Sequence, residues 1–259
     1  MKNFGAIVIA LILFTGCSTV PRSFHPEQPL RFQEFSHKNF NEVLQSHVSE
    51  GVVKYSQIAK DARFQAYIFQ LDRLDPNTLP TKDDRLAFWI NAYNAFAIKG
   101  ILDGYSPRNK FGQWRYFIGQ KYQVGGESLN LYDLERAILI KEFHEPRMHF
   151  AIVCASKSCP KLRSGAYSPA KLDEQLNDSA SRFINDPARN RFDREEKVAY
   201  LSKIFDWFTE DFVAHSGSLT NYVSQFVQDP ALAQELRTTN YTVEFLDYDW
   251  NLNGIPPGV

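Results

Sequence analysis

Two cysteines and a histidine lie within one short segment, residues 149–160, whose sequence is HFAIVCASKSCP. A cysteine thiolate is a nucleophile, and a histidine is a common base for activating it. Four residues lie between Cys154 and Cys159 in the sequence. This spacing also allows a disulfide across a tight loop. Three interpretations follow: a structural disulfide, which we favour, a catalytic thiol with His149 as its base, and a redox switch.

The predicted backbone places His149 and Cys154 far apart. Residues 148–154 are almost entirely apolar and predict a buried central strand. Five positions along a strand correspond to roughly 16 Å, and an odd separation directs the two side chains to opposite faces of the sheet. A base acts within about 3 Å of its nucleophile. Cys159, on the following loop, is therefore the better geometric partner for His149.

The apolar stretch 85–102 predicts a helix that is buried on nearly all sides. It contains Asn91 and Asn94, which are three residues apart and therefore share a face. A buried amide without partners costs about 1–3 kcal/mol, so both amides must meet polar groups. Either they form a structural hydrogen-bond network, which is the simpler interpretation, or they bind a ligand together with Trp89 and Tyr93 of the same helix.

His149 can also be considered apart from the cysteines. If the buried helix packs across its strand, the expected partners of the imidazole are Asn91, Asn94, Tyr93 and Glu135. A histidine beside a carboxylate and amides is how a general acid–base site is built, although a histidine in a buried strand is more often a neutral core residue. The histidines do not follow a zinc-ligand spacing, so we assign no metal, and we expect no cofactor.

The remaining patterns predict helices and short strands that position these segments. Gly125-Gly126 is typical of a two-residue hairpin turn. Helical patterns mixed with scattered strands indicate an α+β fold, with one mixed sheet of several strands packed against the largely buried helix and further helices around it. The expected helices cover residues 40–48, 58–74, 85–102, 131–140, 169–184, 203–212 and 219–227, and the expected strands cover 121–124, 127–129, 148–154, 198–201 and 242–246.

Residues 1–16 are typical of a secretory signal peptide, with a basic residue, a short apolar run and small residues before Cys17. The apolar run is too short to span a bilayer, which needs about 20 residues. The sequence up to Cys17 resembles a bacterial lipobox, which implies acylation of this cysteine with chains such as palmitate; an ordinary secretory signal is the alternative. Ser18 resembles the signal for export to the outer membrane.

These features predict a lipid-anchored protein of the cell envelope, on the periplasmic face of the outer membrane. Several acyl chains together give a stable membrane anchor. Residues 17–35 contain scattered prolines without an apolar period and are interpreted as a lipidated N-terminus and tether. Residues 36–259 are expected to form a single α+β domain.

The composition excludes several other classes of protein. Of the 259 residues, 44% are hydrophobic and 23% are charged, as in an ordinary globular protein rather than a disordered or coiled-coil chain. A formal net charge of −1 gives no basic surface for nucleic acid, and we expect no such partner. The aromatic content of 14% favours a well-packed core and an aromatic-lined cleft.

Several segments together resemble one known family. Residues 87–95 (AFWINAYNA), 149–154, the triplet at 158–160 and residues 248–253 (YDWNLN) are similar, in this order, to the family catalogued as domain of unknown function five hundred and forty-seven. The similarity extends from about residue 36 to the end of the chain. This family has no assigned activity, so the resemblance implies a fold rather than a reaction.

Two functional hypotheses follow. The first is a thiol-dependent hydrolase or transferase acting on an amide or peptide bond, with Cys154 or Cys159 as the nucleophile and His149 as the base. In this hypothesis Glu135 or Asn91 orients the base. The second is a non-catalytic binding or scaffold lipoprotein of the envelope, in which the two cysteines form a structural disulfide. A peptide, a cell-wall fragment or another protein is the expected partner, besides the membrane.

Overall fold

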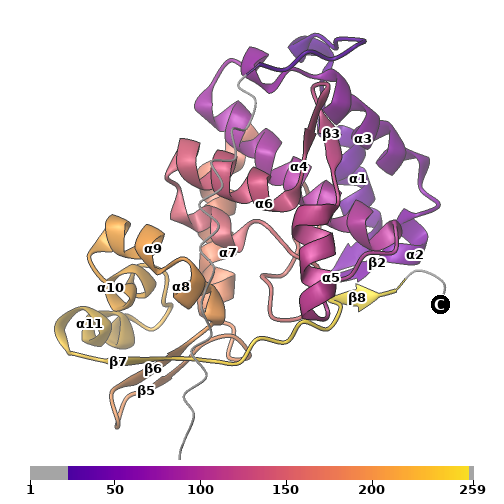
Figure 1. Ribbon diagram of the computed structural model, residues 1–259. Coiled ribbons are helices and arrows are strands. Elements are labelled where there is room, and N and C mark those ends of the chain that lie inside the picture. Colours follow the sequence, from indigo (N-terminus) through magenta and orange to yellow (C-terminus); the bar gives the residue numbers. More distant parts are fainter. Residues whose placement is uncertain (1–22, 257–259) are drawn as a thin grey trace, which may run out of the picture.

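Helix α4 (Lys82–Leu102) runs through the middle of the fold (Figure 1). Every residue from Leu86 to Ile98 is buried. The helix begins after Thr81, whose hydroxyl accepts a hydrogen bond from the Asp84 N–H, while the Asp84 carboxylate accepts one from the Thr81 N–H. This capping box satisfies two N–H groups that would otherwise lack partners. The predicted buried helix is therefore confirmed and begins three residues earlier than expected.

The computed structural model describes residues 23–256, so the predicted signal peptide and Cys17 lie outside the described residues. Part of the predicted tether packs onto the domain, since Phe24 is buried against Trp89 with 6.0 Å between the ring centroids. None of the helices within residues 23–256 is long and apolar enough to cross a membrane. The elements before α4 are η1 (Phe32–Glu34), α1 (Lys38–His47), β1 (Val48–Ser49), β2 (Val52–Lys54), α2 (Tyr55–Ile58), α3 (Ala62–Arg73) and η2 (Pro76–Thr78).

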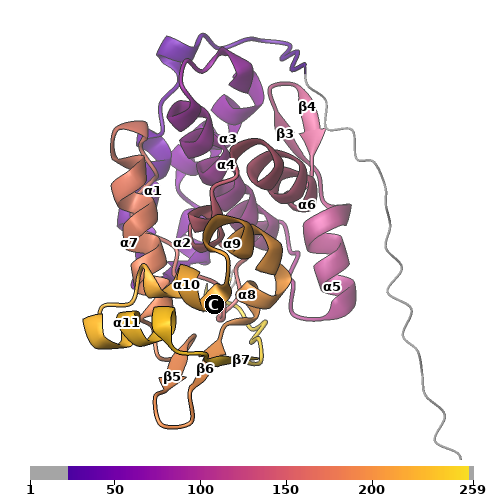
Figure 2. The same ribbon diagram turned by 90° about the vertical axis from the view of Figure 1, so that its left-hand side faces the viewer.

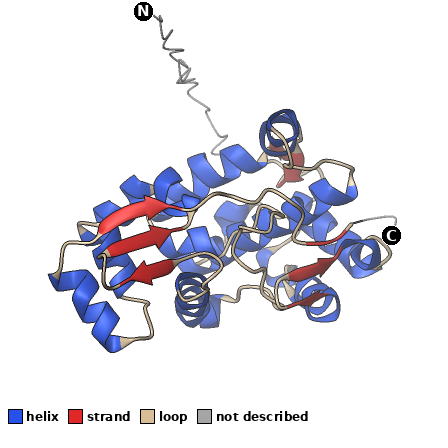
Figure 3. Ribbon diagram, turned by 90° about the horizontal axis from the view of Figure 1, so that it is seen from below, coloured by secondary structure: helices blue, strands red, loops and turns tan. Residues whose placement is uncertain are grey.

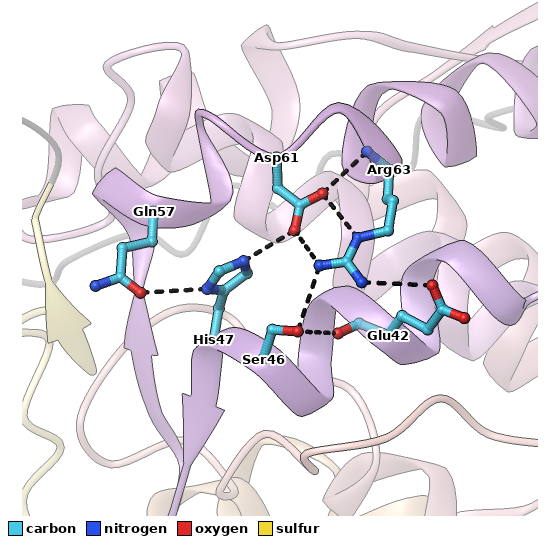
Figure 4. Close-up of polar contacts among 6 residues, drawn as sticks. All are labelled: Glu42, Ser46, His47, Gln57, Asp61 and Arg63. Carbon is cyan, nitrogen blue, oxygen red and sulfur yellow. Dashed lines mark hydrogen bonds and ion pairs between the residues drawn. The ribbon is translucent and has the colours of Figure 1, made fainter.

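A polar network joins α1 to the start of α3 (Figure 4). The Asp61 carboxylate accepts a hydrogen bond from the Arg63 N–H as the cap of α3, and it binds the Arg63 guanidinium at 2.6 Å and His47 Nε2 at 2.9 Å. Arg63 also lies 3.4 Å from the Glu42 carboxylate. The hydrogen bonds from Arg63 hold the pKa of the Asp61 carboxyl well below its usual range. The network divides the expected helix 58–74, because Asp61 is a cap rather than a helical residue.

The segment after α4 carries the hairpin and a long irregular helix. Gly125 and Gly126 both have positive φ, and they connect β3 to β4 as predicted. Helices α6 and η4 follow one another directly and confirm the helix expected over 131–140. The elements are α5 (Lys110–Trp114), the π-helical η3 (Arg115–Gly119), β3 (Tyr122–Val124), β4 (Glu127–Leu129), α6 (Leu131–Asp133), the π-helical η4 (Leu134–Phe143) and the 3-10 helix η5 (Pro146–Phe150).

The C-terminal part forms a second apolar core beside the core around α4. Phe150 belongs to this second core, with ring centroids 4.9 Å from Phe183 and 5.7 Å from Phe212. The predicted helix 203–212 is interrupted at Phe208 and forms two helices. The elements are η6 (Pro169–Lys171), α7 (Leu172–Ile184), β5 (Arg191–Asp193), β6 (Val198–Leu201), α8 (Lys203–Trp207), α9 (Thr209–Ser216), α10 (Leu219–Ser224), α11 (Pro230–Thr238), β7 (Thr242–Phe245) and β8 (Gly254–Ile255).

The strands are distributed over three small sheets rather than one (Figure 3). One sheet has the order β1-β2-β8, with β8 parallel to β2 through the pair Val53 and Gly254. The hairpin β3-β4 forms the second sheet, and the third has the order β5-β6-β7 with β7 parallel to β6. Helices predominate and the sheets are small and mixed, so the predicted α+β class is confirmed.

The expected central strand over residues 148–154 is wrong. Pro146 begins the 3-10 helix η5, and the N–H groups of Ala151 and Ile152 both bond to the Met148 carbonyl. The next backbone groups are satisfied by a side chain of α4: Asn94 donates to the Ala151 carbonyl at 2.9 Å and accepts from the Val153 N–H at 2.8 Å. The apolar run therefore indicated burial correctly, but an amide takes the place of a neighbouring strand.

We expect Asn94→Ala to destabilise the fold by at least about 2 kcal/mol, because two buried backbone groups lose their partner and each costs about 1–3 kcal/mol. Urea unfolding followed by circular dichroism measures the change. Gln65→Ala, at an exposed position on α3, is the control and should change the free energy of unfolding by less than about 0.5 kcal/mol. Equal stability of the two variants would contradict the structural role of Asn94.

Candidate functional site

Cys154 and Cys159 form a disulfide, with 2.22 Å between the sulfurs and 6.2 Å between the Cα atoms. The expected bond between the two cysteines is confirmed, and in this structure neither sulfur is a thiol. The Tyr248 hydroxyl lies 3.2 Å from Cys154 Sγ and donates a hydrogen bond to Cys159 Sγ at 3.1 Å. Ser156 lies 3.2 Å from Cys154 Sγ and donates to the Tyr248 hydroxyl at 2.9 Å.

The C-terminal segment holds the disulfide loop in place. The N–H of Lys157 bonds to the Asn251 carbonyl at 2.7 Å, and the N–H of Asn253 bonds to the Ala155 carbonyl at 3.0 Å. Ala155 has a φ of 62°, a left-handed conformation that non-glycine residues rarely adopt. These bonds bring Tyr248 to the sulfurs from a distant part of the sequence.

A cavity of about 380 Å³ opens beside the disulfide, and both cysteines line it. Its walls are mainly apolar, and their aromatic side chains come from α4, α5, η3, α6, the α8–α9 junction and the C-terminal segment. Trp207 lies 4.7 Å from Tyr248 and 5.7 Å from Trp250 between ring centroids. The aromatic lining residues are Tyr93, Trp114, Phe117, Tyr132, Trp207, Phe208, Tyr248 and Trp250.

The outer edge of the cavity is apolar and exposed. Trp114, Ile118 and Tyr132 line the cavity, and they are 56%, 41% and 45% exposed. Trp114 belongs to α5, Tyr132 to α6 and Ile118 to η3, which follows α5 directly, and Figure 2 shows α5 and α6 on the same side of the molecule. Lys110 and Arg136 also line the cavity, and the Arg136 guanidinium lies 4.4 Å above the Phe208 ring centroid.

Glu135 is the acidic side chain in the lining of this cavity. It is half-buried on the π-helical η4, and irregular helices of this kind are frequent at functional sites. Burial raises the pKa of Glu135 to about 7, with the neighbouring Asp211 acting in the same direction and Arg136 opposing it. No donor among the described residues hydrogen-bonds to this carboxyl. It is therefore a carboxyl with a perturbed pKa that faces open space.

His149 has a different partner from those predicted. Its Nε2 lies 2.8 Å from Asp211 Oδ2, and the imidazole packs on Phe208 with 4.0 Å between the ring centroids. The side chain is 1% exposed, and burial lowers its pKa against the opposing effect of Asp211. A neutral imidazole that donates from Nε2 leaves Nδ1 as an acceptor, and Nδ1 has no partner.

The side-chain amides of Asn91 and Asn94 on α4 each form two hydrogen bonds to the backbone of a neighbouring segment. Asn91 donates to the Tyr167 carbonyl at 2.8 Å and accepts from the Tyr167 N–H at 2.9 Å, as Asn94 does for residues 151–153. Neither amide is among the residues that line the aromatic cavity, and Trp89 is packed in the core. Tyr93, on the same helix, does reach the cavity. The two amides and His149 therefore do not share one pocket.

Of the predicted site residues, the structure brings Tyr93, Glu135, His149, Cys154 and Cys159 to one cavity. The aromatic content predicted an aromatic-lined cleft, but sequence reasoning did not identify the tryptophans and tyrosines outside α4 that line it. The segments around Trp207 and Tyr248 carried a signal, because aromatic residues are mixed with polar residues there, but that pattern equally fits a core helix and a sheet edge. Between residues 23 and 256 no cluster of three or more His, Cys, Asp or Glu side chains could hold a metal ion.

Residues 76–184 match the model of the family described as "Protein of unknown function, DUF547". The predicted resemblance is confirmed over this segment, which contains the cysteines, His149, Glu135 and Tyr93 but ends before Trp207 and Tyr248. The match is shorter than the stretch expected from the sequence. No curated protein and no solved structure matches the chain.

We expect Glu135→Gln to stabilise the protein near pH 8 and to leave its stability unchanged near pH 4.5. The folded-state pKa of about 7 lies above the ordinary value of 4.5, so the stability contributed by the protonated carboxyl is lost as the pH rises through 7. Removing the charge should recover about 1–3 kcal/mol near pH 8. Urea unfolding at the two pH values measures this.

Glu210→Gln is the matched control, because Glu210 is exposed on α9. Its stability should follow that of the unmodified protein at both pH values. A Glu135→Gln variant that is less stable near pH 8 would show that the carboxylate is satisfied in the folded state.

Proposed function

We propose that this chain is a lipid-anchored protein of the cell envelope that binds a small, mostly apolar molecule in the aromatic cavity. The observation that carries the proposal is the cavity itself: about 380 Å³ of space with aromatic walls and few polar groups. Binding sites for small molecules are typically concave and apolar, with volumes of about 300–1,000 Å³ and a small number of polar groups that orient the ligand.

The carboxyl of Glu135 favours a ligand that donates a hydrogen bond, because the carboxyl has no donor within the described part of the chain. A half-buried carboxyl without a donor reduces the stability of the folded protein, and residues that do so in a cleft are candidates for function. A hydroxyl or an amine on the ligand would supply the missing donor, while the aromatic rings of Trp207 and Trp250 would cover its apolar body. A peptide or a cell-wall fragment can present such groups.

The disulfide favours binding over thiol-dependent hydrolysis or transfer. A nucleophilic cysteine must be a free thiolate, whereas Cys154 and Cys159 are bonded to each other. His149, which is hydrogen-bonded to Asp211 through Nε2, therefore has no free thiol to activate. In the proposed function the disulfide shapes the wall of the cavity.

An envelope location is supported by the signal and lipobox pattern before Cys17 and by the disulfide, because disulfides persist in oxidising compartments such as the periplasm. The acyl chains would connect the protein to the outer membrane and leave the domain facing the periplasm. The membrane is then the first partner, and the cavity ligand is the second.

We expect Trp207→Ala to weaken binding of N-phenyl-1-naphthylamine, an uncharged aromatic amine, by about tenfold or more, because the ligand loses one aromatic wall. The full-length chain with Cys17→Ser provides a protein without acyl chains for the titration. Fluorescence reports binding, since Trp114, Trp207 and Trp250 line the cavity. Phe69→Ala is the matched control, because Phe69 is an exposed aromatic residue that does not line the cavity. Absence of saturable binding to the unmodified cavity, or an equal loss in both variants, would refute the proposal.

We expect Cys17→Ser to release the protein from the membrane fraction of a two-membrane bacterial host. Loss of the acylated residue removes the anchor, and a single apolar segment of this length does not span the bilayer. Fractionation and metabolic labelling with an alkyne analogue of palmitate measure both effects. Ser18→Ala is the control and should remain labelled. A Cys17→Ser variant that still incorporates the label would disprove acylation at this position.

A further inference from the structure

We infer that the Cys154–Cys159 disulfide is redox-active and exchanges with a dithiol that enters the aromatic cavity, with Cys154 as the sulfur that is attacked and Cys159 as the leaving sulfur. This activity goes beyond ligand binding. It rests on the position of the disulfide in the cavity wall, on the unequal burial of the two cysteines and on the groups that donate to Cys159 Sγ.

The two cysteines differ in accessibility. Both line the cavity, but Cys159 is only 3% exposed, whereas Cys154 is half-buried. An attacking thiolate must approach a sulfur directly. The cavity therefore leads a thiol to Cys154, and Cys159 is the sulfur that leaves.

Hydrogen-bond donors are already in place for a thiolate on Cys159. The backbone N–H of Cys154 donates to Cys159 Sγ at 3.0 Å, and the Tyr248 hydroxyl donates to it at 3.1 Å. Donors that stabilise a thiolate lower its pKa and make it a better leaving group. Burial raises the pKa of Tyr248, so its hydroxyl keeps the proton that it donates. Ser156 donates to the Tyr248 oxygen and holds the phenol in this orientation.

The exchange is balanced in two steps. First, one thiolate of the dithiol attacks Cys154 Sγ, a mixed disulfide forms, the bond between the two cysteines breaks, and its electron pair leaves with Cys159 Sγ. Second, the other thiolate of the dithiol attacks the sulfur that the dithiol contributed to the mixed disulfide. A disulfide forms within the dithiol, and Cys154 leaves as a thiolate. The dithiol is oxidised to a disulfide by two electrons, and the two cysteines are reduced by two electrons.

The loop around the cysteines is suited to reversible exchange. Its backbone is held by the C-terminal segment, through Lys157 to Asn251 and through Asn253 to Ala155, and none of these bonds involves a sulfur. The two thiols therefore stay adjacent after reduction, which favours closure of the ring when an oxidised partner returns.

The first test is the rate at which dithiothreitol reduces the folded full-length chain carrying Cys17→Ser, followed by maleimide labelling and mass spectrometry. We expect reduction without denaturant, and we expect Tyr248→Phe to slow it by about tenfold through loss of one hydrogen bond to the developing thiolate. Tyr200→Phe is the matched control and should leave the rate unchanged, because Tyr200 on β6 neither lines the cavity nor contacts a sulfur. The same measurement in urea should give equal rates for all three proteins.

The second test traps the mixed disulfide with glutathione disulfide. In the same background, Cys159→Ser should acquire one glutathione at Cys154, whereas Cys154→Ser should acquire it at least about tenfold more slowly at the buried Cys159. Two results would overturn the proposal. One is a disulfide that dithiothreitol reduces only after unfolding, and the other is an unchanged reduction rate in Tyr248→Phe.

Discussion

The side chain of Asn94 is the interaction on which the rest of the site depends. It lies on a helix that is buried on almost all sides, and it pairs with the backbone of residues 151–153 in the way that a neighbouring strand would. Without this pairing, a buried segment would leave a carbonyl and an N–H unsatisfied, which proteins rarely tolerate. His149 lies just before this segment and Cys154 just after it. One amide therefore positions both the imidazole and the first cysteine, and Asn91 clamps the segment at Tyr167 in the same way.

The cavity forms where the two apolar cores meet. The 3-10 helix η5 ends with Phe150, which enters the C-terminal core, while Ile152 and Val153 belong to the core around α4. Between the cores, Glu135 has no hydrogen-bond donor among the described residues and the pKa of its carboxyl is raised. A structure selected for stability alone would fill this space or satisfy this carboxyl. The cavity and the perturbed carboxyl together are the physical basis for proposing a bound molecule.

The disulfide is positioned by two distant parts of the chain. Its loop follows directly from the segment that Asn94 holds, and its donors come from the C-terminal segment through Tyr248. That segment continues past the loop to β8, which pairs with β2 from the beginning of the domain. The C-terminal segment therefore links the N-terminal strands to the disulfide, and it supplies Tyr248 and Trp250 to the aromatic lining of the cavity. Ligand binding and thiol exchange, as proposed, use the same space.

The order and type of most of the longer elements could be predicted from the sequence, because apolar periodicity and the Gly125-Gly126 turn depend only on residues that are close together in the chain. The proximity of the two cysteines was likewise local, and it was sufficient to favour a disulfide. The prediction of a strand over 148–154 was wrong because an apolar run indicates burial but does not show which group pairs with its backbone. Here that group is a side chain from a helix that is distant in the sequence. Two other contacts were not expected because their partners are also distant in the sequence. Asp211 lies 62 residues from His149, and Tyr248 lies 89 residues from Cys159. The sequence by itself determined most of the longer helices and the turn, and it favoured the disulfide, because these features depend on neighbouring residues. Only tertiary packing decided which carboxylate meets the imidazole, which hydroxyl meets the sulfurs and that a cavity lies beside the disulfide.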